Sequence, residues 1–181
     1  MTSRRTFGAV ALTFSAAALF ALSYGGIAHA ITDTLFRYST PKAGYLSLGP
    51  MSFAPADSST TPNYTSQSGD FLEADNTGCF VAPVNLPQGA ALTNFTAWVS
   101  GPIAGVDVKF IRHNLATGAK VVIAELTMSN ADFGRLMLNQ SITPALTVNN
   151  QVFNYGVSVC VQAAARYYAG RVAYTYQDAG D

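Results

Sequence analysis

The sequence is poor in charge and in the residue types that most often carry catalysis. Lys and Arg number 10 and Asp and Glu number 10 in 181 residues, and there are two histidines, two cysteines and one tryptophan. Lys and Arg form no basic stripe of the kind that neutralises phosphates, so we expect no nucleic-acid partner. They form no cluster that would attract an anionic membrane surface either.

The first 30 residues have the three parts of an export signal. Arg4 and Arg5 precede a charge-free, alanine-rich run over residues 6–24, and Ala28-His29-Ala30 supplies an A-x-A cleavage site. We therefore predict a signal peptide over residues 1–30 and a secreted or periplasmic mature protein. If the segment were not cleaved, it would be the chain's one membrane contact, because a run of this length can span a bilayer.

The export route stays open. Ser3-Arg4-Arg5-Thr6-Phe7 is similar to the twin-arginine consensus of bacterial export. Adjacent arginines also occur in ordinary signals, so both routes are alternatives. Without residues 1–30 the chain loses Arg4 and Arg5, which leaves eight basic and ten acidic residues and a net charge near −2.

The rest of the chain predicts an all-β fold. It is rich in β-branched and aromatic residues, and turn signals separate short apolar runs at regular spacing. We expect eight or nine antiparallel strands in a β-sandwich, jelly-roll-like, over residues 44–181, after a linker or edge segment at residues 31–43. One helical turn is expected within 129–139. The clearest strand predictions are 79–86, 92–100, 106–113, 121–128, 142–148, 153–161 and 168–176.

Alternation predicts which side of each strand faces the core. In 92–100 the apolar side carries Phe95, Ala97 and Val99, which leaves Trp98 on the polar side. In 168–176 the pattern places Tyr168, Val172, Tyr174 and Tyr176 on one side and Arg171 on the other. Residues 121–128 are apolar on both sides, which predicts a central strand.

Two segments carry a resemblance. Residues 80–93 (FVAPVNLPQGAALT) and 110–118 (FIRHNLATG) are similar to a recurrent pattern in secreted bacterial β-sandwich proteins of the jelly-roll kind. The likeness spans residues 79–176 and consists of strand edges and turns. It implies the sandwich fold and bacterial export, and it implies no activity and no catalytic residue.

The two cysteines predict a disulfide. Cys79 and Cys160 both lie in the predicted mature chain, and export would place them in an oxidising compartment. One internal bridge is the favoured interpretation, with free thiols or a bridge between molecules as the alternatives. Two thiols and a distant histidine make no zinc signature.

Candidates for chemistry are few. His113 is the one histidine outside the signal, and no G-x-S-x-G elbow is present, so we assign no catalytic residue. Asp70, Glu73 and Asp75 gather in a loop-like segment, where hard oxygen ligands suit calcium. Calcium is the one cofactor that these residues suggest. The same carboxylates could also act as acid and base in a carbohydrate-active hydrolase.

The aromatic residues favour binding. Trp98, Tyr168 and Tyr176 are the candidate platform for sugar rings or for a protein surface. We therefore expect an exported, non-enzymatic binding or structural module. The alternatives are the hydrolase and a self-assembling cell-surface structural protein, since sheet edges also support homo-oligomers.

Overall fold

The computed structural model describes residues 36–57, 64–65 and 70–179. The predicted signal peptide at residues 1–30 lies outside the described residues. The described part consists of strands and one short 3-10 helix, with these bounds: β1 (Phe36–Leu48), η1 (Pro50–Ser52), β2 (Ala54–Pro55), β3 (Tyr64–Thr65), β4 (Glu73–Ala74), β5 (Gly78–Pro83), β6 (Ala91–Gly101), β7 (Val106–Asn114), β8 (Lys120–Thr127), β9 (Asp132–Thr147), β10 (Phe153–Val161) and β11 (Arg166–Ala179).

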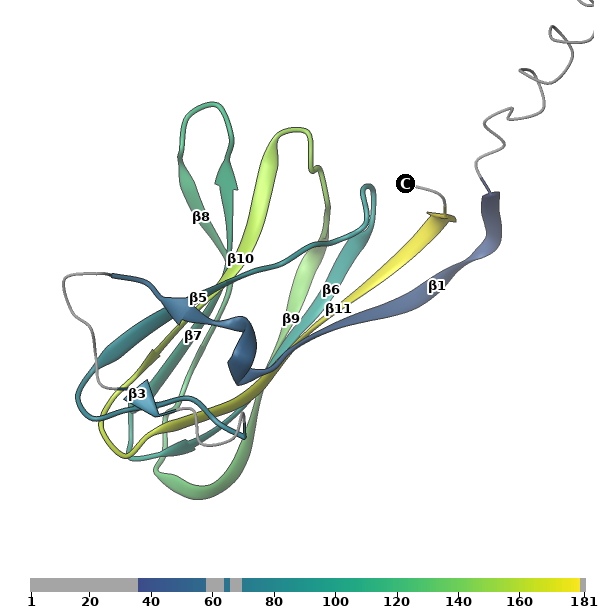
Figure 1. The fold of residues 1–181 in the computed structure, drawn as a ribbon. Helices are drawn as coiled ribbons and strands as arrows, with labels where there is room; N and C mark the ends of the chain where they lie inside the picture. The colour runs from purple at the N-terminus through teal and green to yellow at the C-terminus, as the bar shows by residue number, and fades with distance from the viewer. Residues whose placement is uncertain (1–35, 58–63, 66–69, 180–181) are drawn as a thin grey trace, which may run out of the picture. The chain divides into compact units, whose positions relative to one another are not determined.

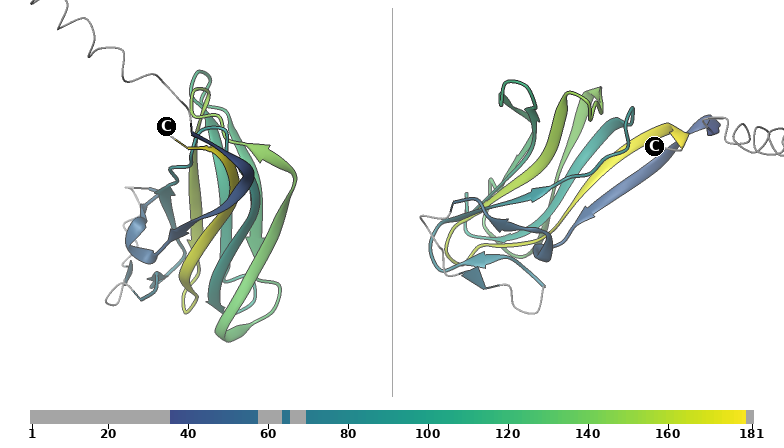
Figure 2. Two further views of the ribbon diagram at one scale, coloured as in Figure 1. Left: turned by 90° about the vertical axis from the view of Figure 1, so that its right-hand side faces the viewer. Right: turned by 45° about the horizontal axis from the view of Figure 1, so that its top comes forward.

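The long strands form two antiparallel sheets. One sheet has the order β1-β11-β6-β9 and the other the order β2-β5-β10-β7-β8 (Figure 1). Among the eight long strands, all successive pairs but the β7–β8 hairpin change sheet along the chain. This alternation produces two Greek keys and is the strand order of a jelly roll. The predicted all-β sandwich is therefore confirmed, and Figure 2 gives two further views of it.

Period-two alternation places the core between the sheets. In β10 the side chains of Tyr155, Val157, Val159 and Val161 are buried, whereas the residues between them are more exposed. Phe95, Ala97 and Val99 of β6 are fully buried on the facing sheet, as their spacing predicted. Burying this apolar surface is the main term that stabilises the domain.

An aromatic cluster occupies the middle of the core. The ring centroid of Phe110, in β7, lies 5.5 Å from that of Phe95 and 6.4 Å from that of Tyr155. Phe110 is fully buried, and its two ring partners come from different sheets. Phe110 therefore joins the two layers.

Tyr167 supplies a buried polar contact in the same core. Its hydroxyl donates a hydrogen bond to the Leu48 carbonyl oxygen at 3.0 Å, and the side chain is fully buried. Burial raises the pKa of this phenol far above its ordinary value, so the hydroxyl keeps its proton and remains a donor. The bond ties β11 to the end of β1.

Removing this hydroxyl tests the contact. We expect Tyr167→Phe to lower the free energy of unfolding by about 1–2 kcal/mol, because it removes a buried hydrogen bond at almost constant shape. Urea denaturation followed by circular dichroism measures the change. Tyr45→Phe is the matched control, since the Tyr45 side chain is 61% exposed, and it should leave the midpoint within error. Equal effects of the two variants would contradict the assignment.

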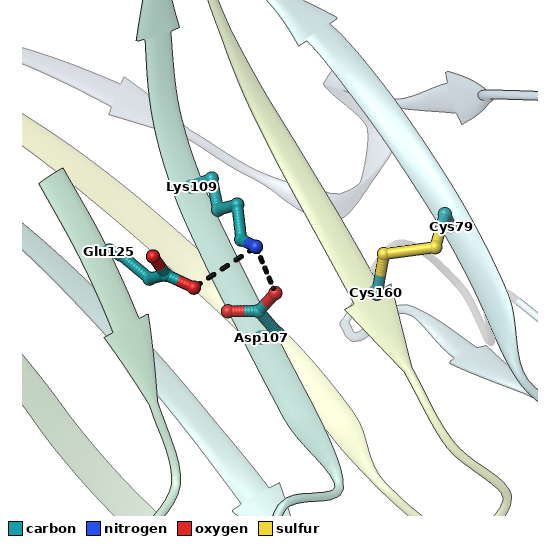
Figure 3. The surroundings of a disulfide bond; sticks show 5 residues. All are labelled: Cys79, Asp107, Lys109, Glu125 and Cys160. Carbon is teal, nitrogen blue, oxygen red and sulfur yellow. Dashed lines mark ion pairs between the residues drawn. A yellow bond between two sulfur atoms is a disulfide. The ribbon is translucent and has the colours of Figure 1, made fainter. Parts of the chain in front are cut away.

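The predicted disulfide is confirmed. Cys79 and Cys160 are directly opposite in the β5–β10 ladder and their sulfurs are bonded (Figure 3). Beside them on β7, the Lys109 ammonium lies 3.1 Å from an Asp107 oxygen and 3.0 Å from a Glu125 oxygen. Hydrogen bonds to these carboxylates raise the pKa of Lys109. The outer side of the five-stranded sheet thus carries the disulfide and a charge cluster in which one ammonium group pairs with two carboxylates.

Two sequence predictions about single elements are wrong. The helical turn expected within residues 129–139 is instead the first half of β9, which runs along β6 from Asp132 to Thr147. The strand at 121–128 is the edge of its sheet, and its neighbouring residues Val121 and Val122, one on each face, are 44% and 42% exposed. In β9, backbone pairing with β6 outweighs the weak helical preference of residues 129–139.

The first long strand also starts earlier than expected. β1 begins at Phe36, within the segment predicted as a linker or edge segment, and it forms an edge of the four-stranded sheet against β11. Among the described residues, no helix has the length and apolar character needed to cross a membrane.

Candidate functional site

One surface of the domain gathers aromatic, amide and arginine side chains. It is the outer side of the four-stranded sheet, and strand register and side-chain contacts assign its members. We call this surface the Trp98 face. Its residues are Tyr45 from β1, Tyr168 and Arg171 from β11, Asn94, Thr96, Trp98 and Ser100 from β6, and Arg135, Met137 and Asn139 from β9.

Trp98 lies at the centre of this surface. In the ladder it is opposite Ala169 on one side and Met137 on the other. The indole is half-buried, while Tyr45 and Met137 are 61% and 55% exposed. Because Ala169 has a small side chain, it leaves room beside the indole ring.

Arg171 links the two large rings. Its guanidinium carbon lies 5.2 Å from the ring centroid of Tyr45 and 5.4 Å from that of Trp98, within the range of a cation–π contact. The arginine therefore fills the space between β1 and β6 above the sheet. Such contacts hold both rings in fixed positions before any ligand arrives.

A second cluster continues the surface toward the end of β6. The hydroxyl oxygens of Tyr168 and Ser100 lie 3.1 Å apart, within hydrogen-bond distance. The guanidinium carbon of Arg135 lies 4.4 Å from the Tyr168 ring centroid. Phe71 packs edge-on against the same ring at 6.1 Å. Tyr168 is thus held on three sides.

Amide groups lie on the other side of Trp98. The Thr96 hydroxyl oxygen is 2.9 Å from the Oδ1 atoms of both Asn94 and Asn139. Thr96 is buried beneath its neighbours even though it points out of the sandwich. Through it, two amides on neighbouring strands are fixed next to the aromatic rings, where they offer hydrogen-bonding groups to a ligand.

The structure separates the three residues predicted as a platform. Trp98 and Tyr168 share the Trp98 face, whereas Tyr176 lies on the core side of β11. Its ring packs against Tyr174 at 6.0 Å and Tyr38 at 5.8 Å, and it borders the hydrophobic core. Placing Tyr168 and Tyr176 on one side was wrong because a bulge between Tyr167 and Ala169 inserts one residue and reverses the alternation.

The acidic residues are not arranged as one site. Asp70 and Asp75 are exposed, whereas a Glu73 oxygen accepts a hydrogen bond from the Arg166 Nε at 2.8 Å. This hydrogen bond raises the pKa of Arg166. Within the described ranges, no three His, Cys, Asp or Glu side chains are grouped so that they could hold a metal ion. The calcium site stays a prediction, and the Glu73 carboxylate already has a cationic partner.

Several members of the Trp98 face were not singled out as site residues from the sequence. Tyr45, Arg135 and Met137 come from strands whose pairing is not readable in the chain. Arg171 had a usable signal, because alternation already placed this lone cation on the outward side of its strand. An outward-facing arginine with no acidic residue near it in its strand can therefore mark a binding surface.

Two hollows in the described part lie away from the Trp98 face. The larger, of about 500 Å³, is bordered by Leu86, Leu115 and Phe153 and has no charged residue in its lining. The smaller, of about 280 Å³, lies between β8 and β9 and includes Arg112, which stacks on the Phe153 ring at 4.4 Å. Neither hollow includes Trp98.

Comparisons with known proteins found structural likeness only. No family model and no curated protein matches the chain. The C-terminal CBM6 of LamC, a marine laminarinase from Zobellia galactanivorans, is 13% identical with a TM-score of 0.46 and matches over 71% of this chain and 98% of its own. The xylan-binding module CBM15 is 12% identical with a TM-score of 0.45. It matches over 75% of this chain and 100% of its own.

A third similar structure is the carbohydrate-binding module CBM6cm-2 from Cellvibrio mixtus lichenase 5A in complex with cellotriose. It is 14% identical with a TM-score of 0.44 and matches over 70% of this chain and 95% of its own. At such low values no residue role passes from these proteins to this chain. Its function has to be argued from the Trp98 face itself.

Proposed function

We propose that this chain is an exported, non-enzymatic carbohydrate-binding protein and that the Trp98 face is its binding surface. The observation that carries the proposal is the placement of Trp98, Tyr45 and Tyr168 on one outward sheet surface, held by arginines. Export through residues 1–30 is part of the proposal, and the Cys79–Cys160 disulfide supports it, because such bonds persist outside the cytoplasm.

The chemistry of the face suits a sugar chain. Sugar rings offer apolar C–H surfaces that pack on aromatic rings, and they offer hydroxyls at their edges. The face supplies both complements, since it carries the Trp98 indole and also the amides of Asn94 and Asn139 beside Thr96.

Binding to a panel of soluble polysaccharides tests the proposal. We expect Trp98→Ala to weaken binding at least tenfold, equivalent to about 1.4 kcal/mol, because the central ring is lost. Tyr45→Ala is expected to have a smaller effect in the same direction. Isothermal titration of each purified variant measures the affinity, and circular dichroism verifies that it is folded.

Tyr176→Leu is the matched control for an aromatic residue of β11. It removes a ring on the core side of the sheet, so the affinity should stay unchanged. Unchanged affinity of Trp98→Ala would place the sugar elsewhere. Binding of no glycan, together with a mass above the monomer in light scattering, would favour the self-assembling alternative.

A further inference from the structure

Arg171 is a cation without an anionic partner. Within the described residues no carboxylate lies within ion-pair distance of it, whereas Arg37 and Arg166 each have one, at 3.5 Å and 2.8 Å. The Arg171 Nε is buried and has no hydrogen-bond acceptor. The Arg112 Nε is in the same state, and because the Arg171 Nε is shielded from solvent, an anion would bind Arg171 through its terminal Nη groups.

The surroundings of Arg171 favour the binding of an anion. Tyr45 and Trp98 flank the guanidinium, so their rings restrict its conformations. A planar guanidinium held in this way presents a fork of donors that matches a carboxylate or a sulfate group. The aromatic walls also lower the local exposure to water, which strengthens a charge-assisted hydrogen bond.

Arg135 repeats the arrangement on the same surface. Its guanidinium stacks on Tyr168, and none of the described acidic side chains pairs with it. The nearby acid Asp132 instead accepts a hydrogen bond from the Gly134 amide at 2.8 Å. Glu73, at the margin of the face, is neutralised by Arg166. The face therefore carries two arginines that form no ion pair with a carboxylate of the described residues.

The two arginines are anchored at different positions along β6. Arg171 is opposite Thr96 in the ladder, and Arg135 stacks on the tyrosine that contacts Ser100. Thr96 and Ser100 are four residues apart, which is about 13 Å along an extended strand. Trp98 lies between them. In the direction of β6, the face thus presents Arg171, then the Trp98 ring, then Arg135.

We propose that the Trp98 face recognises acidic saccharides, in which carboxylate or sulfate groups of an extended chain meet Arg171 and Arg135 while a sugar ring between them packs on Trp98. This inference rests on the proposed carbohydrate binding and names its ligand class. A chain with several anionic groups is required to engage both arginines at once.

Paired ligands that differ only in charge test the inference. Polygalacturonate and its methyl ester share a backbone, and dextran sulfate and dextran form a second pair. We expect the wild-type protein to prefer the charged member of at least one pair about tenfold at low salt. The pair that shows the preference identifies the anion as carboxylate or sulfate.

Substitutions at Arg171 test whether the Trp98 face causes the preference for charged ligands. Arg171→Gln should lower the affinity for the charged ligand about tenfold more than it lowers the affinity for the neutral ligand. Arg171→Lys should recover part of the loss, because it restores the charge without the fork. Lys120→Gln removes the same charge from the exposed edge strand β8 and should change neither affinity.

The outcomes separate this inference from the proposed function. Equal loss for charged and neutral ligands in Arg171→Gln would mean that Arg171 only positions Trp98, which overturns the inference and keeps the sugar site. Equal loss in Lys120→Gln and Arg171→Gln would reveal general charge attraction, which also overturns it. Binding of no glycan at all would reject the proposed function itself.

Discussion

Replacing both Cys79 and Cys160 by alanine is expected to lower the free energy of unfolding by about 4 kcal/mol. The two residues are 81 apart in sequence, so the bond closes a long loop that contains β6 to β9. Without the bond the unfolded chain gains conformational freedom, whereas the folded ladder keeps its pairs on either side, Phe80 with Val159 and Gly78 with Val161.

Urea denaturation measures this loss. With a slope of about 2 kcal/mol per molar, the midpoint should fall by about 2 M. Adding a reductant to the wild-type protein should reproduce the shift, and the reductant should have no effect on the double variant. A wild-type midpoint that is insensitive to full reduction would contradict the expected contribution of the bond.

Phe110→Ala is expected to have an effect of similar size, about 3–5 kcal/mol. The phenyl ring is fully buried and contacts Phe95 and Tyr155, so its loss removes apolar burial and leaves a cavity between the sheets. A variant of this kind should unfold at a lower temperature, and calorimetry gives the change. If Phe110→Ala does not fold, Phe110→Leu should show a smaller loss in the same direction.

Phe133→Ala provides the comparison for the same chemical change at the surface. The Phe133 side chain is 76% exposed at the start of β9, so its removal should alter the free energy of unfolding by less than about 0.5 kcal/mol. A loss at Phe133 that equals the loss at Phe110 would mean that this part of β9 is covered in solution.

The sequence predicted the sandwich because most strands alternate without interruption. β10 follows a strict period of two from Tyr155 to Val161, and the core-facing residues of β6 do so from Phe95 to Val99, so Trp98 was correctly placed outward from the sequence alone. The disulfide was also predictable, although from the expected compartment and the cysteine count rather than from geometry.

Bulges limited the prediction of the site. A bulge at Tyr167/Ala169 moves Tyr168 to the outer side, and a second irregularity pairs Ala173 and Tyr174 with Asn94 and Leu92. Each bulge adds one residue on one strand only, and no local residue preference marks its position in this chain. Tyr176 was therefore grouped with Tyr168 although the sheet separates them.

Long-range pairing was the other limit. Tyr45, Trp98, Arg135 and Arg171 come from four strands, and only the strand order β1-β11-β6-β9 brings them together. Alternation shows which way a side chain points but not which strand lies beside it. The same limit explains β8, which is apolar on both faces like a covered central strand but lies at the edge of its sheet.

The position of Trp98 has a practical consequence for spectroscopy. It is the one tryptophan of the chain, so all indole emission of the native protein arises at the centre of the Trp98 face. The indole is half-buried beside a guanidinium, an environment that changes when the sheet opens or when a ligand displaces water from the ring. Intrinsic fluorescence therefore follows both unfolding and occupancy of this surface without an added label.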